Sequence, residues 1–250
     1  MRDDLGAECD LPARPTRVVS LVPSLTEAIA ASASGVLVGA TDWCTHPRGL
    51  DVVRVRGTKN PHLERIVSLR PDLVVANEEE NRQRDVEALR DNGIPVWVTD
   101  VRSVNGALTS LERLLDLIAA PERGWLDAAQ AAWSAPARKP AYRAVVPIWR
   151  RPWMFLGSGT YAGDVLRRLG VTNVLGDHPQ RYPWCDLGEL PAYDVVVLPD
   201  EPYRFTADDG PEAFPGMPCP LVDGRSLTWY GPAMVSAPTV LGAALTAARL

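Results

Sequence analysis

The sequence predicts an α/β protein made of two Rossmann-like lobes with parallel sheets, joined by a helical segment. Apolar runs of strand length alternate with segments of helical periodicity, which is the pattern of parallel sheets covered by helices. The alternation stops over residues 104–133 and resumes after a linker at residues 134–140. The chain has 250 residues, 46% of them hydrophobic, so it can form two cores of about a hundred residues each. A single doubly wound domain with a long helical insertion is the alternative.

The first lobe, residues 1–103, carries clear strand and helix signals. Ser24 and Glu27 have the spacing of a capping box at the start of the first helix. Gly93 is expected to end a later helix, because glycine adopts the left-handed conformation that terminates helices. The expected elements are, in order, a strand at residues 17–22, a helix from about residue 23, a helix at 63–69, a strand at 72–76, a helix at 78–91 and a strand at 94–100.

The connecting segment, residues 104–139, is predicted to be helical. Apolar residues fall at helical spacing from Val104 to Ile118, and further helical periodicity covers residues 122–133. The second lobe, residues 140–250, then returns to the alternation of the first. Its expected elements are a strand at residues 143–148, a helix at 160–169, strands at 194–198 and 219–222, and a closing helix at about 233–249.

Composition excludes several classes of partner. The net charge is −5 and the 26 basic residues form no run, so we expect no nucleic-acid partner. No window approaches the roughly 20 apolar residues of a membrane span, and the start lacks the apolar stretch of a secretory signal. We therefore expect a cytoplasmic protein. A chain whose signal peptide had been removed would have the same sequence features, and its location would then be periplasmic or otherwise extracytoplasmic.

Tryptophan placement points to a ligand cleft. Five of the eight tryptophans lie beside turn residues, where a predicted strand or helix ends; these are Trp43, Trp149, Trp153, Trp184 and Trp229. An indole ring on a loop at the carboxyl end of a strand is typical of a ligand site in α/β proteins. Packing of these rings in the core is the alternative.

A series of motifs resembles the helical-backbone metal receptor family, whose members are substrate-binding proteins for cobalamin, haem and ferric siderophores. The motifs occur in the family's order: DLG at residues 4–6, RVVSLVPSLTE at 17–27, VG at 38–39, LERI at 63–66, LRPDLV at 69–74 and GIPV at 93–96. Within the family, the resemblance is greatest to the cobalamin-binding proteins.

This resemblance implies a periplasmic-binding-protein-like fold in which a rigid connecting helix joins the lobes and the groove between them holds a flat metal complex. The ligand would be cobalamin, another corrinoid or a related metal chelate. Trp43 and Trp184 match aromatic walls of such a site, and Trp229 lies near a third. In family members coupled to an ABC transporter, one glutamate per lobe docks onto the permease; Glu64 matches the first and Glu189 roughly matches the second.

The chain also departs from the family pattern. Thr58 and Lys59 stand where the resemblance implies a tryptophan, and the run at residues 77–81 (NEEEN) replaces another aromatic residue with carboxylates. Both changes favour a smaller or more polar metal complex, or a different organic ligand. Alternatively, the glutamates form a solvated helix N-terminus, where carboxylates are favourable.

Cys44 and His46 are candidate metal ligands. A thiolate and an imidazole two residues apart on a loop can reach one borderline or soft metal ion, and His46 can serve as an axial ligand of a corrinoid. The alternative is that Cys44 is buried and His46 is hydrogen-bonded to the backbone.

The second lobe adds further candidates around its strand ends. The turn at residues 157–160 (GSGT) has the backbone N–H groups to hold a carboxylate or phosphate, and a neighbouring arginine can assist. The full set of predicted ligand-binding residues is Trp43, His46, Asn77, Trp149, Arg150, Trp153, Trp184, Tyr203, Arg225, Trp229 and Tyr230.

The sequence favours a non-catalytic binding protein whose partner is a small-molecule metal complex, with a separately bound metal ion as a further option. An ABC transporter permease would be a partner if the protein is exported. A cytosolic metal-dependent enzyme on the same fold, a ferric-siderophore or haem binder, and a scaffold or regulator are the alternatives. Neither the Gly-x-Ser-x-Gly motif nor the His-Glu-x-x-His motif of common hydrolases occurs.

Overall fold

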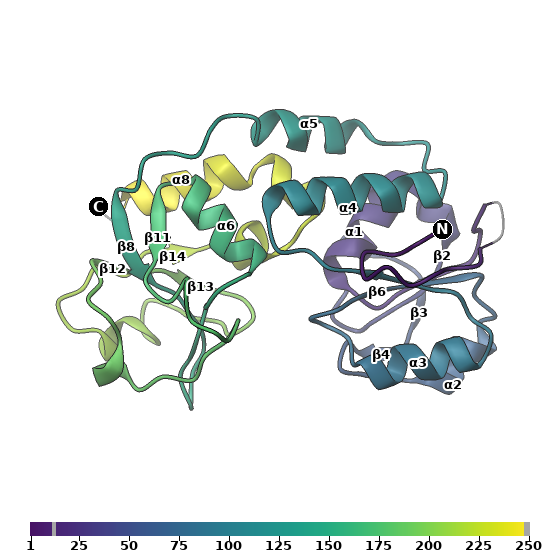
Figure 1. Cartoon of the computed structure of the whole chain (residues 1–250), viewed down its shortest axis with the longest axis horizontal. Helices are drawn as coiled ribbons and strands as arrows, with labels where there is room; N and C mark the ends of the chain where they lie inside the picture. Colours follow the sequence, from purple (N-terminus) through teal and green to yellow (C-terminus); the bar gives the residue numbers. More distant parts are fainter. Residues whose placement is uncertain (12–13, 248–250) are drawn as a thin grey trace. The chain divides into compact units, whose positions relative to one another are not determined.

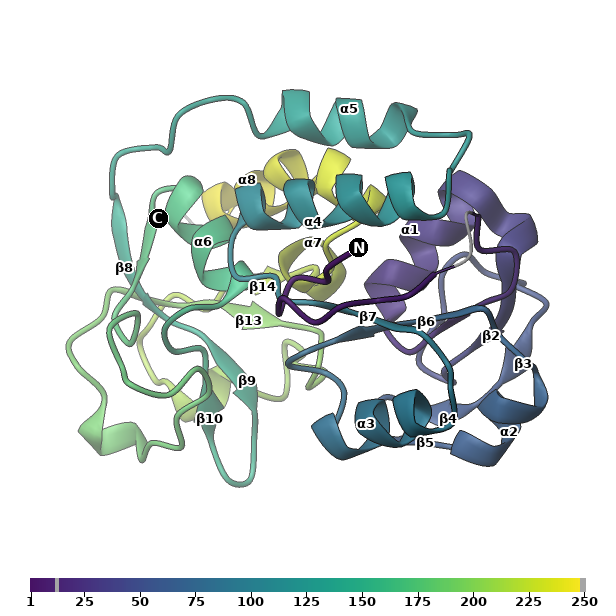
Figure 2. The same cartoon turned by 45° about the vertical axis from the view of Figure 1, so that its right-hand side comes forward.

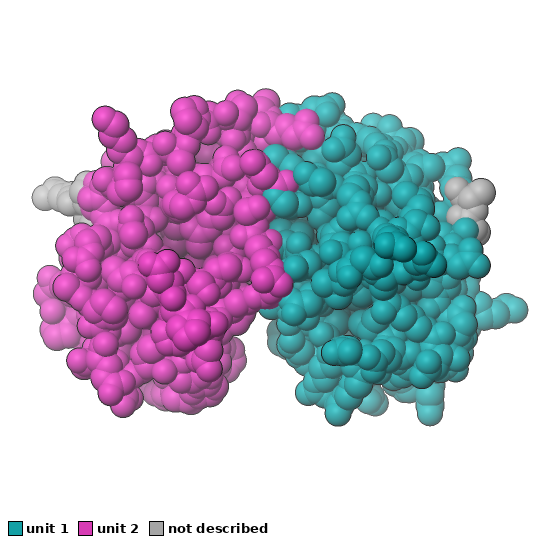
Figure 3. Space-filling view, viewed as in Figure 1, with its two compact units in different colours: residues 1–101, 106–127, 230–232 teal, residues 102–105, 128–229, 233–250 magenta. Residues whose placement is uncertain are grey.

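The computed structural model describes residues 1–11 and 14–247 of the chain (Figure 1). These residues form two compact units, coloured separately in Figure 3. Unit 1 comprises residues 1–101, 106–127 and 230–232. Unit 2 comprises residues 102–105, 128–229 and those from 233 onward. The chain therefore enters unit 1 three separate times.

Unit 1 is built on a parallel sheet with the strand order β3-β2-β1-β6-β7. Its strands are β1 (Val18–Ser20), β2 (Leu37–Ala40), β3 (Val53–Arg54), β6 (Leu73–Asn77) and β7 (Val96–Thr99). After β1, the strands β2 and β3 are added on one side of it, and β6 and β7 are then added on the other side. The order therefore reverses beside β1, and in open α/β sheets the carboxyl ends of strands at such a point form the usual ligand site.

Helices cover both faces of this sheet. They are α1 (Pro23–Ala33), α2 (Leu63–Ser68), α3 (Gln83–Asp91) and α4 (Val104–Leu117), and α5 (Gly124–Ala132) follows. In both views α1 and α4 lie on one side of the sheet, and α2 and α3 lie on the other (Figures 1 and 2). On the second side, Ile66 of α2 and Leu89 of α3 share a core cluster with Val19, Val74 and Val96 of the strands. The pair β4 (Arg56–Gly57) and β5 (Asn60–Pro61) forms a short antiparallel hairpin before α2.

Unit 2 repeats the α/β pattern with shorter elements. A parallel sheet has the order β11-β8-β12, and β13 pairs in parallel with β14. The elements are β8 (Tyr142–Val145), β9 (Pro147–Trp149), β10 (Met154–Phe155), α6 (Tyr161–Arg168), β11 (Val171–Asn173), β12 (Val195–Val196), β13 (Leu198–Pro199), β14 (Leu221–Val222), α7 (Gly224–Thr228) and α8 (Ala237–Ala247), with 3-10 turns at Leu187–Glu189, Pro211–Ala213 and Pro232–Val235. β9 and β10 form an antiparallel hairpin that projects the loop at residues 150–153.

Two expected helix starts and one expected cap differ from the structure. The capping box is not formed, because α1 begins at Pro23 with Val22 as its N-cap, which places Ser24 inside the first turn. The helix expected at residues 78–91 begins at Gln83 instead, since the Asn77 side chain holds the intervening residues in a turn. The closing helix begins as a 3-10 turn and continues as α8; its expected end at residue 249 lies outside the described residues.

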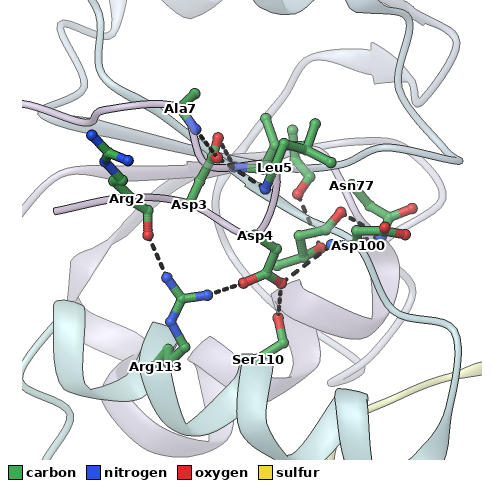
Figure 4. A network of polar contacts seen from close by, with 12 residues as sticks. Arg2, Asp3, Asp4, Leu5, Ala7, Asn77, Asp100, Ser110 and Arg113 are labelled. Atoms are coloured by element: carbon green, nitrogen blue, oxygen red, sulfur yellow. Dashed lines mark hydrogen bonds and ion pairs between the residues drawn. The ribbon is translucent and has the colours of Figure 1, made fainter.

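A segment at the amino terminus folds against β7 and α3 through the carboxylate of Asp3. Figure 4 shows the contacts of this carboxylate with Leu5 and Ala7. This side chain is fully buried. Its Oδ1 accepts hydrogen bonds from the backbone N–H groups of Leu5 (3.0 Å) and Ala7 (2.8 Å). Its Oδ2 pairs with Arg90 at 3.0 Å and lies 3.4 Å from the N–H of Val98. One carboxylate thus connects the segment to a helix and to the edge strand.

Asp4, the next residue, connects the same segment to α4. Its carboxylate accepts hydrogen bonds from the Ser110 hydroxyl at 2.5 Å and from the Asp100 N–H at 3.2 Å, and it pairs with Arg113. The Arg113 guanidinium also lies 5.0 Å above the ring of Trp97, a fully buried residue of β7. The segment therefore covers the edge of the sheet, which would otherwise expose unpaired backbone groups.

No helix among the described residues has the length and apolar character required to cross a membrane.

Candidate functional site

In unit 1, the carboxyl ends of the strands carry a polar network centred on Asn77. The Asn77 amide nitrogen donates to the backbone oxygen of Thr99 at 3.0 Å, and its Oδ1 accepts from the N–H groups of Glu79 and Glu80. Asn81 in turn donates from its side chain to the backbone oxygen of Thr58 at 3.0 Å. Asn77 is buried and its amide is used within this turn, so its role in the structure is to shape the strand end.

The turn places Glu80 in an unusual environment. Burial and the nearby Glu79 carboxylate raise the pKa of Glu80 to about 7, while the Lys59 ammonium opposes the change. Tyr230 is buried in the same unit, and burial together with the Glu80 carboxylate raises the pKa of its phenol well above the ordinary value. The glutamate run lies in the turn before α3, which begins at Gln83, and Glu79 and Glu80 are partly buried there.

Replacing Glu80 by glutamine should flatten the pH dependence of stability between pH 5 and 8. The folded protein binds a proton at Glu80 more tightly than the unfolded chain, whose carboxyl has the ordinary pKa of 4.5. Stability contributed by this group is therefore present below about pH 4.5 and lost as pH rises to about 7. Because Glu80 is only half-buried, we expect Glu80→Gln to stabilise the protein by about 1–2 kcal/mol at pH 8.

Urea unfolding of the wild type and the variant at pH 5, 6, 7 and 8 measures this effect. Glu78→Gln, which alters an exposed carboxylate of the same run, is the matched control. Parallel pH profiles for the wild type and Glu80→Gln would contradict the assignment of the titration to Glu80.

The loop after β2 carries Trp43, Cys44 and His46. The Trp43 side chain is 66% exposed. Cys44 is fully buried, where its sulfur contacts the hydroxyl groups of Thr26 at 3.0 Å and Thr41 at 3.1 Å, and burial raises the pKa of its thiol. The structure therefore matches the alternative in which Cys44 is a buried thiol.

His46 is half-buried, and its Nδ1 lies 3.1 Å from the Thr45 hydroxyl. Within the part of the chain that the structure describes, no group of three or more His, Cys, Asp or Glu side chains is arranged to hold a metal ion. Among the candidates on this loop, Trp43 is thus the one most open to contact with a ligand.

In unit 2, Trp149 and Trp184 are the exposed aromatic candidates. Trp149, the last residue of β9, is 45% exposed and meets the ring of Tyr203 edge-on, with centroids 5.6 Å apart. Trp184 is 57% exposed and forms an isolated antiparallel bridge with Met154 of β10. Trp149 therefore lies on the β9–β10 hairpin itself, and Trp184 lies on the segment that pairs with β10.

Two other predicted ligand contacts are engaged within unit 2. Trp153 stacks on Phe205 with centroids 6.1 Å apart and packs against the core of the unit. Arg150 lies over the Trp153 ring at 5.2 Å and forms ion pairs with Asp209 and Glu212. These contacts tie the loop at residues 150–153 to the chain around residues 205–212.

Trp229 and Arg225 also interact with each other. Trp229 is buried, and its Nε1 donates to Oε2 of Glu201 at 3.0 Å. The Arg225 guanidinium lies 5.7 Å from the centre of the Trp229 ring. Burial raises the pKa of Glu201, and the Asp200 and Asp223 carboxylates add to this effect. Glu201 is not among the predicted ligand-binding residues, although it lies in the loop two residues after the end of β13.

The turn at residues 157–160 is shaped by a close approach of two backbone segments. The N–H of Gly157 donates to the backbone oxygen of Arg181 at 2.7 Å. A Cβ on Gly157 would lie 2.2 Å from the backbone oxygen of Gln180. Thr160 then caps α6 by accepting a hydrogen bond from the Gly163 N–H at 3.2 Å. Gly157 thus fixes the path of the segment that leads to Trp184.

Glu64 and Glu189, the predicted docking glutamates, are both exposed. Glu64 lies in the first turn of α2 in unit 1, and Glu189 ends the 3-10 turn Leu187–Glu189 in unit 2.

Comparison with known proteins gives relatives in sequence and similar solved structures. A vitamin B12-binding protein of Photorhabdus laumondii subsp. laumondii is 30% identical over 184 residues, which cover 69% of this chain and 66% of that protein. The periplasmic vitamin B12 binding protein BtuF of Vibrio cholerae has a TM-score of 0.75 at 19% identity, covering 95% of this chain and 99% of that one. The periplasmic heme-binding protein BhuT, in complex with two hemes, has a TM-score of 0.73 at 25% identity, covering 94% and 99%.

These comparisons confirm the predicted periplasmic-binding-protein-like α/β fold with parallel sheets. They give no support to the expected cytoplasmic location, because both solved structures are of periplasmic proteins. The alternative of a location outside the cytoplasm agrees with them.

The family comparison covers most of the chain. A match to the periplasmic binding protein family extends over residues 18–198, from β1 to β13. It includes the strand ends that carry the polar network of unit 1 and the β9–β10 hairpin of unit 2. The chain therefore belongs to the periplasmic binding protein family.

Proposed function

We propose that this chain binds a corrinoid, with cobalamin as the first candidate, or a related flat metal chelate. The observation that carries the proposal is the exposure of the Trp43, Trp149 and Trp184 indoles at or beyond strand ends, in a chain 30% identical to a vitamin B12-binding protein. Large apolar rings are unfavourable in water and are typical of surfaces that a ligand covers. The faces of a corrin ring are apolar, so such indoles are suitable contacts.

The chemistry of unit 1 supports a ligand with a polar rim. The turn at residues 77–81 brings carboxyl and amide groups to the strand ends, with the Lys59 ammonium donating to the backbone oxygen of Glu79. A corrinoid has amide groups around its macrocycle, and these both donate and accept hydrogen bonds. A protonated Glu80 can donate a hydrogen bond and an ionised Glu80 can only accept one, so binding is expected to respond to pH near neutrality.

An absorption titration of the protein with cyanocobalamin, dicyanocobinamide and haem tests this function. We expect a spectral change on binding a corrinoid, and we expect Trp43→Ala and Trp184→Ala each to weaken binding about tenfold, as loss of an aromatic contact does. Trp125→Phe is the control, because this indole donates to the Ser32 hydroxyl at 2.8 Å within unit 1.

The possible outcomes separate the candidates. Binding of haem without either corrinoid would replace the corrinoid proposal with a haem receptor, a candidate favoured by the similarity to BhuT. A flat titration with all three compounds would contradict the proposal. A changed spectrum of the bound corrinoid in His46→Ala would identify His46 as an axial ligand.

We further propose that the protein acts outside the cytoplasm and delivers its ligand to an ABC transporter permease. The support is membership of the periplasmic binding protein family and the exposure of one glutamate in each unit, Glu64 and Glu189. Exposed carboxylates of this kind suit electrostatic docking onto arginines, where complementary charge mainly sets the rate and orientation of association.

A further inference from the structure

Arg150 was expected to contact the ligand, yet its side chain is engaged inside unit 2. It is 13% exposed, and its two terminal nitrogens pair with different carboxylates: Nη1 with Asp209 and Nη2 with Glu212. Its guanidinium also lies over the Trp153 ring. The two carboxylates bind the edge of the planar guanidinium, and the Trp153 ring packs on its face. These contacts make Arg150 a structural residue of the loop that follows β9.

The Asp209 carboxylate extends this arrangement toward Trp149. Its Oδ1 pairs with Arg150, and its Oδ2 accepts a hydrogen bond from the Tyr203 hydroxyl at 2.5 Å. The Tyr203 ring meets the Trp149 indole at an interplanar angle of 78° and also packs on Phe205 at 4.7 Å. A continuous series of contacts therefore leads from the guanidinium to the exposed indole.

The backbone around these residues has only short pairings: Trp149 pairs with Met154 in the β9–β10 hairpin, and Thr206 pairs with Asp209 in an isolated bridge. Trp149 ends a three-residue strand, and residues 203–209 form no helix or strand. Short irregular segments of this kind sample several conformations unless side-chain contacts restrict them. An exposed indole binds a ligand more tightly when its orientation is fixed in advance, because less conformational entropy is lost on binding.

We propose that Arg150 is a positioning residue that fixes the Trp149 indole for the ligand through Asp209 and Tyr203. This inference rests on the proposed function, in that Trp149 contacts the bound corrinoid. It differs from the simpler view in which the Arg150 guanidinium itself pairs with an acidic or amide group of the ligand. The two views make opposite predictions about variants that lack Trp149.

A double-mutant cycle on cyanocobalamin affinity separates them. Arg150→Met keeps the aliphatic stem and removes the charge; we expect it to weaken binding about tenfold in the wild-type background and less than about twofold in the Trp149→Ala background. An undiminished loss in the Trp149→Ala background would overturn the proposal, because the guanidinium would then act on the ligand directly. Arg143→Met, which changes an exposed arginine of β8, is the matched control.

A measurement without ligand keeps the inference testable if the proposed function fails. In protein labelled with 5-fluorotryptophan, the ¹⁹F resonance that disappears in Trp149→Phe belongs to Trp149. We expect this resonance to shift and broaden in Arg150→Met, and to shift less in Tyr203→Phe, which loses the hydroxyl and retains the ring. An unchanged resonance in a folded Arg150→Met protein would overturn the proposal. Absence of cyanocobalamin binding to the wild type would contradict the proposed function and leave this result standing.

Discussion

Replacement of Asp3 by alanine is expected to lower the free energy of unfolding by about 3 kcal/mol. The carboxylate is fully buried and serves the backbone N–H groups of Leu5 and Ala7 as well as the Arg90 guanidinium. Its removal leaves these donors without their acceptor, and a buried donor that loses its partner costs about 1–3 kcal/mol. Arg90 is partly exposed, so water compensates part of that loss.

Urea unfolding followed by circular dichroism measures the effect. The matched control is Glu8→Ala in the same segment, because Glu8 forms an exposed ion pair with Arg2, and such pairs contribute little to stability. Equal unfolding midpoints for Asp3→Ala and Glu8→Ala would contradict a stabilising role for the Asp3 carboxylate.

Gly157→Ala is expected to destabilise the protein by about 2–3 kcal/mol, the range of an overpacked position. The new Cβ would lie 2.2 Å from the backbone oxygen of Gln180 and 3.0 Å from that of Arg181. Backbone atoms cannot rotate away as a flexible side chain does, so the segment must move. That segment leads directly to Trp184, and the substitution should therefore also weaken ligand binding.

Thermal unfolding and the corrinoid titration check both parts of this expectation. Gly188→Ala is the control, because a Cβ at Gly188 meets no other atom within 4 Å. A Gly157→Ala protein that is as stable as Gly188→Ala would contradict the close approach of the two backbone segments.

The sequence allowed the longer elements of the fold to be predicted, because burial leaves a periodic pattern. Both β6 and β7 are buried along their whole length, and each appears in the sequence as an apolar run. The strands β3, β4 and β5 were missed, since a strand of two residues is too short for any period. The strands β2, β10 and β11 were also missed. The start of α3 was misplaced because the turn held by Asn77 depends on side-chain hydrogen bonds that composition does not reveal.

In the candidate site, too, features with a local sequence pattern were predicted, and contacts between distant residues were not. Of the five tryptophans predicted beside turns, Trp43, Trp149 and Trp184 are exposed, whereas Trp153 and Trp229 pack inside unit 2. For Arg150 the sequence suggested a ligand contact, whereas the structure shows ion pairs with residues about sixty positions later in the chain. Such distant partners depend on the tertiary fold, and a single sequence contains no local pattern that indicates them.

The return of residues 230–232 to unit 1 has a consequence for biosynthesis. Every strand of the β3-β2-β1-β6-β7 sheet lies within the first 101 residues. Tyr230 of the same unit, however, is synthesised only after residues 128–229 of unit 2. At about 5–20 residues per second, a ribosome needs about 5–20 s to translate that interval. For those seconds the nascent amino-terminal unit lacks the tyrosine that is buried beside Glu80, so its maturation is timed by the synthesis of its neighbour.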